Sequence, residues 1–133
     1  MRIVFDTNVL FAAFVAHGVC AGLYEECLLD GRIVVSQFIL QELREKLCTK
    51  AGLNRAEADE VVAAVCADAE VVAVQRLSKP ICRDPDDDWI PATALAAKVD
   101  ALVTGDKDLL VLRRVEAIPI LTPRDCIAFL RNG

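Results

Sequence analysis

The chain has 133 residues and a formal net charge of −5, and 55% of its residues are hydrophobic against 26% that are charged. This length and composition fit a single globular domain spanning residues 1–133 and exclude a disordered chain. The acidic balance argues against a protein that coats nucleic acid nonspecifically, because such surfaces are normally basic. No apolar run reaches the length of a membrane span, and the N-terminus lacks a signal-peptide pattern. We therefore expect a soluble cytoplasmic protein with no membrane partner.

Valine- and isoleucine-rich runs alternate with helical patterns along the chain. Continuous apolar runs are typical of parallel strands that are covered on both faces. Asn54 with Glu57 predicts a capping box, and Thr122 before Pro123 predicts a helix N-terminus. The alternation predicts an α/β domain with a parallel central sheet of four to five strands. The expected strands are Arg2–Asp6, Arg32–Ser36, Glu70–Val74, Ala101–Gly105 and the weaker Ile118–Leu121, and the expected helices are Val19–Leu29, Gln37–Leu47, Asn54–Ala69, Ile90–Val99 and Pro123–Leu130.

The six cysteines and the single histidine argue against zinc chemistry. No C-x-x-C pair is present, so a zinc site is not expected. Most of the cysteines fall among apolar residues in expected helices, where a free thiol behaves as a small hydrophobic side chain. His17 is expected at the surface. No G-x-G-x-x-G or Walker loop occurs, which argues against a nucleotide cofactor.

Aspartates follow two of the expected strands. Asp6 ends the first strand in "VFDTNVL", and Asp106 and Asp108 follow Gly105 in "LVTGDKDLL". A helix N-cap would explain each aspartate by itself. However, ligands of open parallel sheets bind beyond the carboxyl ends of the strands, where both sequences are expected to lie.

Two further acidic stretches are expected near the same edge. Glu42 borders an apolar stripe of the helix after the second strand, so its carboxylate can turn over the sheet edge; an ordinary solvated glutamate is the alternative. The stretch "RDPDDDWIPATAL" contains four aspartates within five residues, and helix capping explains only one or two of them. Asp84 with Pro85 indicates a turn, and Asp86 a solvated charge.

The convergence of these carboxylates predicts a metal site. Asp6, Glu42, Asp106 and one of Asp86–Asp88 would repel one another or take up protons without a cation. Ligand sets made only of oxygen atoms favour Mg²⁺ or Mn²⁺ over zinc. Such a site supports metal-assisted hydrolysis of a phosphodiester.

In this order, the stretches "VFDTNVL", "FILQEL", "RDPDDDWIPATAL" and "LVTGDKDLL" resemble the PIN domain family, from Ile3 to Leu110. The chain looks most similar to the small bacterial PIN proteins that are toxins of type II toxin–antitoxin pairs. The resemblance implies a three-layer α/β/α fold, Mg²⁺- or Mn²⁺-dependent endoribonuclease activity on RNA, and a separate antitoxin protein as partner. It also implies that the chain forms a homodimer, which the apolar early helices would support.

Carried over by motif, the resemblance implies the following residues. The catalytic and metal-binding acids are Asp6, Glu42, Asp87 and Asp106, the supporting residues are Asn8 and Thr104, and Asp108 is an additional acid. Asp87 stands six residues before Thr93, as the family pattern requires. Pro91 leaves Asp88 as the alternative, because a proline at the third helical position costs little whereas one at the fourth removes a backbone hydrogen bond.

We hypothesise that Asp6 and Asp106 hold the principal cation, with Asp87 and Glu42 binding it directly or through water. Lys107 is a candidate contact to the substrate phosphate, with weaker support for Arg44, Lys46 and Lys50.

Two other functions stay open. A haloacid-dehalogenase-like phosphatase also has an aspartate after its first strand, but it needs a second aspartate where this chain has Asn8. A catalytically weak PIN fold that binds RNA or protein is the third candidate, and the intact acidic set argues against it.

Overall fold

The computed structural model describes residues 1–29, 32–75, 81–82 and 88–132. Its sheet has the strand order β3-β2-β1-β4-β6-β5. Every neighbouring pair from β3 to β6 is parallel, and β5 alone runs antiparallel, against β6. The elements in chain order are β1 (Ile3–Phe5), α1 (Thr7–Val15), α2 (Val19–Leu28), β2 (Ile33–Ser36), α3 (Gln37–Thr49), α4 (Arg55–Asp68), β3 (Glu70–Val72), α5 (Trp89–Ala97), β4 (Ala101–Val103), α6 (Lys107–Leu110), β5 (Arg114–Val115), β6 (Ile118–Leu121) and α7 (Pro123–Asn132).

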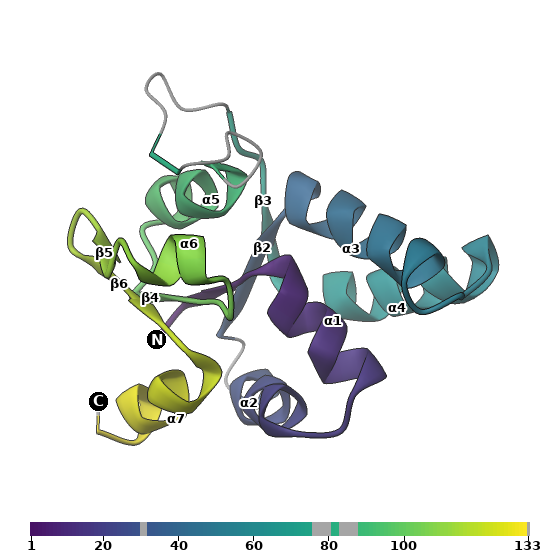
Figure 1. Ribbon diagram of the computed structural model, residues 1–133, viewed down its shortest axis with the longest axis horizontal. Helices are drawn as coiled ribbons and strands as arrows, with labels where there is room; N and C mark the ends of the chain where they lie inside the picture. Colours follow the sequence, from purple (N-terminus) through teal and green to yellow (C-terminus); the bar gives the residue numbers. More distant parts are fainter. Residues whose placement is uncertain (30–31, 76–80, 83–87, 133) are drawn as a thin grey trace.

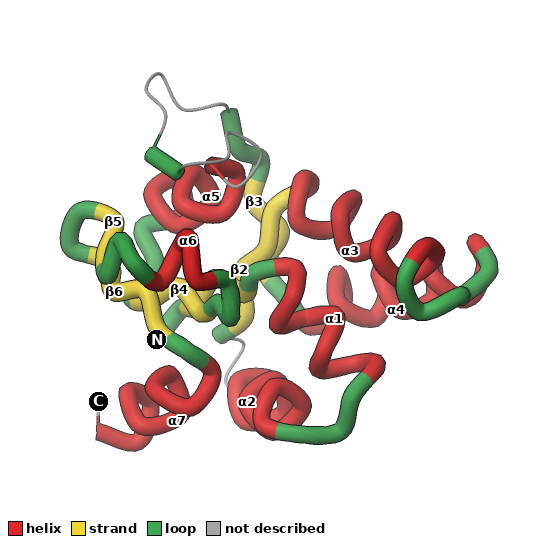
Figure 2. The backbone as a smooth tube through the Cα atoms, in the orientation of Figure 1, coloured by secondary structure: helices red, strands yellow, loops and turns green. Residues whose placement is uncertain are grey.

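The helices cover both faces of this sheet, as Figures 1 and 2 show. Helix α5 lies on one side, and α2 and α7 lie on the other. Helix α3 packs against both α1 and α4 at one end of the molecule. The strands β1, β2 and β4 are buried along their whole length. This arrangement confirms the α/β fold with a mostly parallel central sheet, and it explains why the strand sequences are apolar without alternation.

The helix ends follow the expected capping chemistry. The Asn54 side chain accepts a hydrogen bond from the Glu57 backbone N–H, and the Glu57 carboxylate accepts one from the Asn54 N–H, so the capping box of α4 is present. Thr122 Oγ1 accepts from the Asp125 N–H at the start of α7. Ser36 caps α3, which directs the buried stripe of Ile39 and Leu43 into the core.

Three elements of the structure were not among the expected strands and helices. Helix α1 starts directly after Asp6, α6 is a single turn, and β5 is two residues long. Strand β5 forms a hairpin with β6 around Glu116, whose φ is 53°. Two residues are too short for a periodic signal, and only the pairing with β6 makes them a strand.

The cysteine prediction is confirmed for half of the set. Cys27, Cys82 and Cys126 are buried, Cys20 and Cys48 are half-buried, and Cys66 is exposed. Within the described part of the chain, no single helix is long and apolar enough to cross a membrane, although α1 and α2 would pass together by length and composition despite a bend of 100° between them.

Candidate functional site

Asp6 occupies the carboxyl end of the central strand β1. Its side chain is almost fully buried and makes no capping hydrogen bond to α1, which starts at the next residue. The carboxylate instead accepts a 2.5 Å hydrogen bond from the hydroxyl of Thr104, which follows the neighbouring strand β4. The parallel pairing of β1 with β4 brings these two side chains together, although they are far apart in the sequence. Asp6 is therefore held by the sheet and not used as a helix cap.

Ionisation of the Asp6 carboxyl is unfavourable in this position. Burial raises its pKa above the ordinary value, and the nearby Glu42 carboxylate raises it further. The hydrogen bond from Thr104 and the positive charge of Lys46 act in the opposite direction. A buried carboxylate beside a second one attracts cations, because a cation removes both sources of the unfavourable energy.

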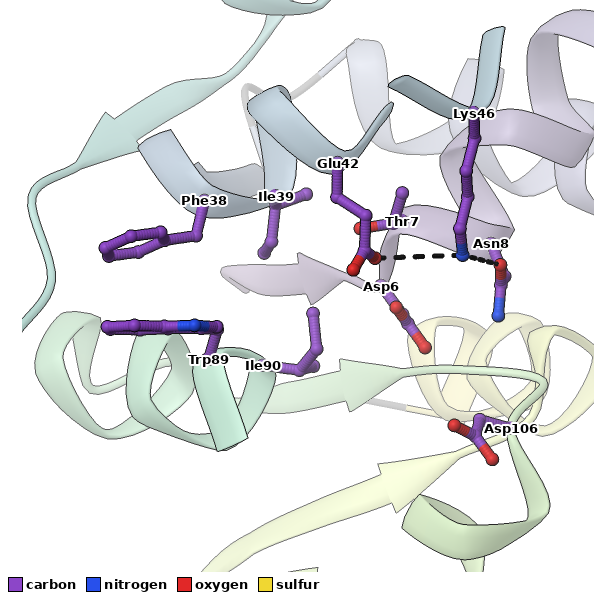
Figure 3. Close-up of a pocket in the computed structure, with 10 residues that line it drawn as sticks. All are labelled: Asp6, Thr7, Asn8, Phe38, Ile39, Glu42, Lys46, Trp89, Ile90 and Asp106. Carbon is purple, nitrogen blue, oxygen red and sulfur yellow. Dashed lines mark hydrogen bonds and ion pairs between the residues drawn. The ribbon is translucent and has the colours of Figure 1, made fainter. Parts of the chain in front are cut away.

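Glu42 and Lys46 reach the same region from α3. Lys46 Nζ lies 3.7 Å from Glu42 Oε1 and donates a 2.7 Å hydrogen bond to Asn8 Oδ1 (Figure 3). Glu42 keeps 44% of its side chain exposed. The expected border position of Glu42 thus brings its carboxylate over the sheet edge, and the ammonium of Lys46 lies between α3 and α1.

Asp106 reaches the site from the end of β4. Its backbone N–H donates a 3.0 Å hydrogen bond to Thr104 Oγ1, and its Oδ1 accepts a 2.9 Å bond from the Asp108 N–H, which caps α6. Thr104 therefore links the two aspartates, donating to one and accepting from the backbone of the other. Lys107 and Asp108 are exposed, and neither lines the pocket described below.

Asp88 has a structural use. Its carboxylate accepts hydrogen bonds from the backbone N–H groups of Ile81 at 3.2 Å and Cys82 at 2.6 Å, and the residue is only 9% exposed. Helix α5 begins at Trp89, so Pro91 takes the third position, where no intrahelical hydrogen bond is lost. Asp84, Asp86 and Asp87 lie outside the described residues.

The side chains that converge here line a pocket of about 60 Å³ (Figure 3). Thr7 Oγ1 is buried within its lining and has no hydrogen-bond partner among the described residues. Two aromatic residues, one from α3 and one from α5, form one end of the pocket; nothing in the sequence singled them out, because they meet only in the folded chain. The lining residues are Asp6, Thr7, Asn8, Phe38, Ile39, Glu42, Lys46, Trp89, Ile90 and Asp106.

The donors in this pocket fit a hard divalent cation. Asp6, Glu42 and Asp106 offer carboxylate oxygens and Asn8 an amide oxygen, and no sulfur or imidazole is present in the lining. In the part of the chain that the structure describes, no three Asp, Glu, His or Cys side chains already form a metal centre. The carboxylates are instead engaged with Thr104, Lys46 and the N-terminus of α6.

Fold and pocket together define an α/β domain with an acidic site at the carboxyl edge of a mostly parallel sheet. The family model described as "PIN domain" matches residues 2–108. The chain belongs to the PIN domain family. No curated protein matches the sequence significantly.

Solved structures with this fold include toxin–antitoxin proteins. VapBC2 from Rickettsia felis, bound to a DNA fragment from its promoter, has a TM-score of 0.66 at 15% identity, over 92% of this chain and 98% of that one. PAE2754 from Pyrobaculum aerophilum has a TM-score of 0.69 at 17% identity, over 100% and 91%. VapC20 from Mycobacterium tuberculosis, a toxin that cleaves the sarcin-ricin loop, has a TM-score of 0.62 at 16% identity, over 89% and 100%. At these identities the likeness establishes the fold.

Proposed function

We propose that this protein is a Mg²⁺- or Mn²⁺-dependent endoribonuclease that serves as the toxin of a toxin–antitoxin pair. The observation that carries the proposal is the meeting of Asp6, Glu42 and Asp106, from three separate elements, in one small pocket. Membership of the PIN domain family supports a nuclease. The names of the structural neighbours, VapBC2 and the cleaving toxin VapC20, support a toxin.

In this proposal Asp6 and Asp106 hold the cation, and Glu42 and Asp87 complete its acidic surroundings. When bound, the cation supplies a Lewis acid for the phosphoryl oxygens and activates water for hydrolysis. Thr104 fixes the orientation of the Asp6 carboxylate through its hydroxyl, and Asn8 holds the Lys46 ammonium. Asp108 is proposed as an additional supporting acid, and Lys107 is proposed to contact the substrate phosphate; both side chains are exposed.

The test is cleavage of single-stranded RNA with Mn²⁺ or Mg²⁺. Asp6→Asn is expected to lower the cleavage rate by at least about 100-fold, because removing one preorganised electrostatic group at a reacting centre costs this much. Asp125→Asn, the same change on the exposed first turn of α7, is the matched control and keeps the wild-type rate. Equal cleavage by the Asp6→Asn variant would reject the site.

The observation that favours the binding-module alternative is that the carboxylates of Asp6, Glu42 and Asp106 are already engaged by Thr104, Lys46 and the Asp108 N–H. Isothermal titration with Mn²⁺ separates the two functions. The nuclease requires binding that is lost in Asp6→Asn, whereas a module that only sequesters RNA requires none.

We also propose two protein partners for this chain. An antitoxin would cover the acidic pocket, and co-purification with the product of the neighbouring gene, followed by loss of RNA cleavage in the complex, tests it. A homodimer would bury the exposed Val15 and Val19 at the α1–α2 corner. Sedimentation equilibrium should give twice the chain mass, and Val19→Asp should return the monomer.

A further inference from the structure

An aromatic pair forms the wall of the acidic pocket opposite Lys46 and Asn8 (Figure 3). Phe38 projects from α3 and Trp89 from the first position of α5, and their rings are stacked with centroids 3.5 Å apart and an interplanar angle of 19°. Both residues are only half-buried. A core contact between two helices would normally be buried completely, so this pair also presents aromatic surface to solvent.

The pair separates two adjoining hollows of different size. The acidic pocket measures about 60 Å³, and a second hollow of about 300 Å³ shares Phe38, Glu42 and Trp89 with it and adds Gln41 and Glu45. The first pocket is small enough to suit an ion with a few waters and not a nucleobase. The second hollow is the adjacent space where a larger group fits.

The charge of the molecule limits how RNA can be held at this position. The net charge is −5, and both hollows are lined by carboxylates. Arg44 forms a 2.8 Å ion pair with Asp59, and Lys46 is engaged by Asn8 and Glu42. Among the described residues that line the two hollows, Lys46 is the one cation, and it is already paired. Stacking of a base on an aromatic side chain needs no positive charge and adds about 5- to 150-fold in affinity per base.

We propose that the Phe38–Trp89 pair and its hollow form a base-binding subsite, which holds one unpaired RNA base beside the scissile phosphate. The aromatic surface contacts the base, and the Gln41 amide faces its polar edge from the hollow's lining. The shared wall places base and phosphate in adjoining spaces, so binding the base positions the phosphodiester at the carboxylates. This inference rests on the proposed ribonuclease function for its choice of ligand.

Trp89 is the only tryptophan in the chain, so its fluorescence reports on this subsite alone. The probe is an eight-nucleotide single-stranded RNA, titrated in EDTA so that no cleavage occurs, beside the same RNA with all bases removed from its central four positions. We expect the complete RNA to quench Trp89 fluorescence and the abasic RNA to bind more weakly by about tenfold or more.

Substitutions separate stacking from a purely structural contact between α3 and α5. Trp89→Leu and Phe38→Leu should each weaken RNA binding by about 5- to 150-fold, measured by anisotropy of labelled RNA, whereas Trp89→Phe should largely retain it. Phe129→Leu, the same kind of change on α7, is the control, because α7 contributes to neither hollow. Circular dichroism melts verify that each variant is folded.

Cleavage of the complete RNA by the wild-type protein with Mn²⁺ is measured in parallel. If the wild-type protein cleaves but folded Trp89→Leu and Phe38→Leu bind like wild type, the subsite is wrong and the nuclease stands. If binding depends on the bases and on the aromatic pair without any cleavage, the subsite stands and the nuclease proposal fails. Equal affinity for complete and abasic RNA would overturn the subsite whatever the cleavage result.

Discussion

At the scale of single residues, we assign different roles to two aspartates of the acidic stretch before α5, Asp87 and Asp88. The Asp88 carboxylate accepts hydrogen bonds from the backbone N–H groups of Ile81 and Cys82, so it holds these two residues against the start of α5. Both oxygens of the Asp88 carboxylate accept these hydrogen bonds, and Asp88 does not line the acidic pocket, so it is the poorer candidate for a cation ligand. Asp87, outside the described residues, is therefore the better candidate, as its spacing from Thr93 predicts.

These two aspartates should respond differently to substitution. Asp88→Ala should lower the free energy of unfolding by about 1–3 kcal/mol, because it removes the carboxylate that accepts the 2.6 Å hydrogen bond from the buried Cys82 N–H. Asp87→Asn should lower RNA cleavage by about 100-fold, as expected for a residue at the reacting centre. Urea denaturation and a cleavage assay measure the two effects, and the reverse pattern would exchange the assigned roles.

The raised pKa of Asp6 predicts a pH-dependent cost to folding in the absence of metal. A folded state with the higher pKa binds the proton more tightly than the unfolded chain, whose aspartate pKa is about 3.9. The cost is therefore absent below this pH and fully present above the folded pKa. Asp6→Asn, which cannot ionise, should be more stable than wild type at pH 7 in EDTA, and this gain should disappear below about pH 4.

Urea denaturation from about pH 3 to pH 8 in EDTA, a range that extends below the unfolded aspartate pKa, measures this difference. The exposed Asp125→Asn variant is the control and should show no comparable gain. A destabilised Asp6→Asn at pH 7 would mean that the hydrogen bond from Thr104 outweighs the burial of the charge.

At the scale of elements, the helix ends account for much of what local chemistry specifies. The C-cap of α5 is an exception, because Lys98 adopts φ 52° and ψ 51°, the left-handed conformation in which glycine is usual. A residue with a Cβ atom is strained there. We expect Lys98→Gly to raise the free energy of unfolding by about 0.5–1 kcal/mol, after the entropy lost by the more flexible unfolded glycine.

Thermal denaturation tests this expectation. Lys98→Ala, which removes the same side chain but keeps the Cβ atom, is the matched control and should give no such gain. Equal stabilisation by both variants would show that the lysine side chain, and not the backbone conformation, is unfavourable.

At the scale of the whole molecule, the sheet brings together carboxylates from distant parts of the chain. A cation bound between them should stabilise the folded state. A ligand that binds only the folded state stabilises it by about 2.7 kcal/mol at 100 times its dissociation constant. Mn²⁺ should therefore raise the melting temperature of the wild-type protein. The rise should be lost in the double variant Asp6→Asn, Asp106→Asn, and an equal rise in that variant would place the cation elsewhere.

Local patterns in the sequence were sufficient for the framework. The valine and isoleucine runs predicted β1, β2 and β4, Asn54 and Glu57 predicted their capping box, and the stripe through Ile39 and Leu43 predicted that Glu42 lies at its border. These features depend on neighbours within one turn or one strand, so a short stretch of sequence is enough to predict them. The order of the acidic motifs along the chain indicated the PIN domain family.

Only the tertiary structure decided how the side chains are used. From the sequence, Asp6 could be either a helix cap or a site residue. The pairing of β1 with β4 brings Thr104 to its carboxylate, and this contact favours the second role. The two-residue strand β5 exists because β6 is beside it. Phe38 and Trp89 became a stacked pair only when α3 and α5 packed together. Contacts between residues so far apart leave no local periodicity, which is why the sequence determined the strands and the acids, and folding decided the pocket that they line.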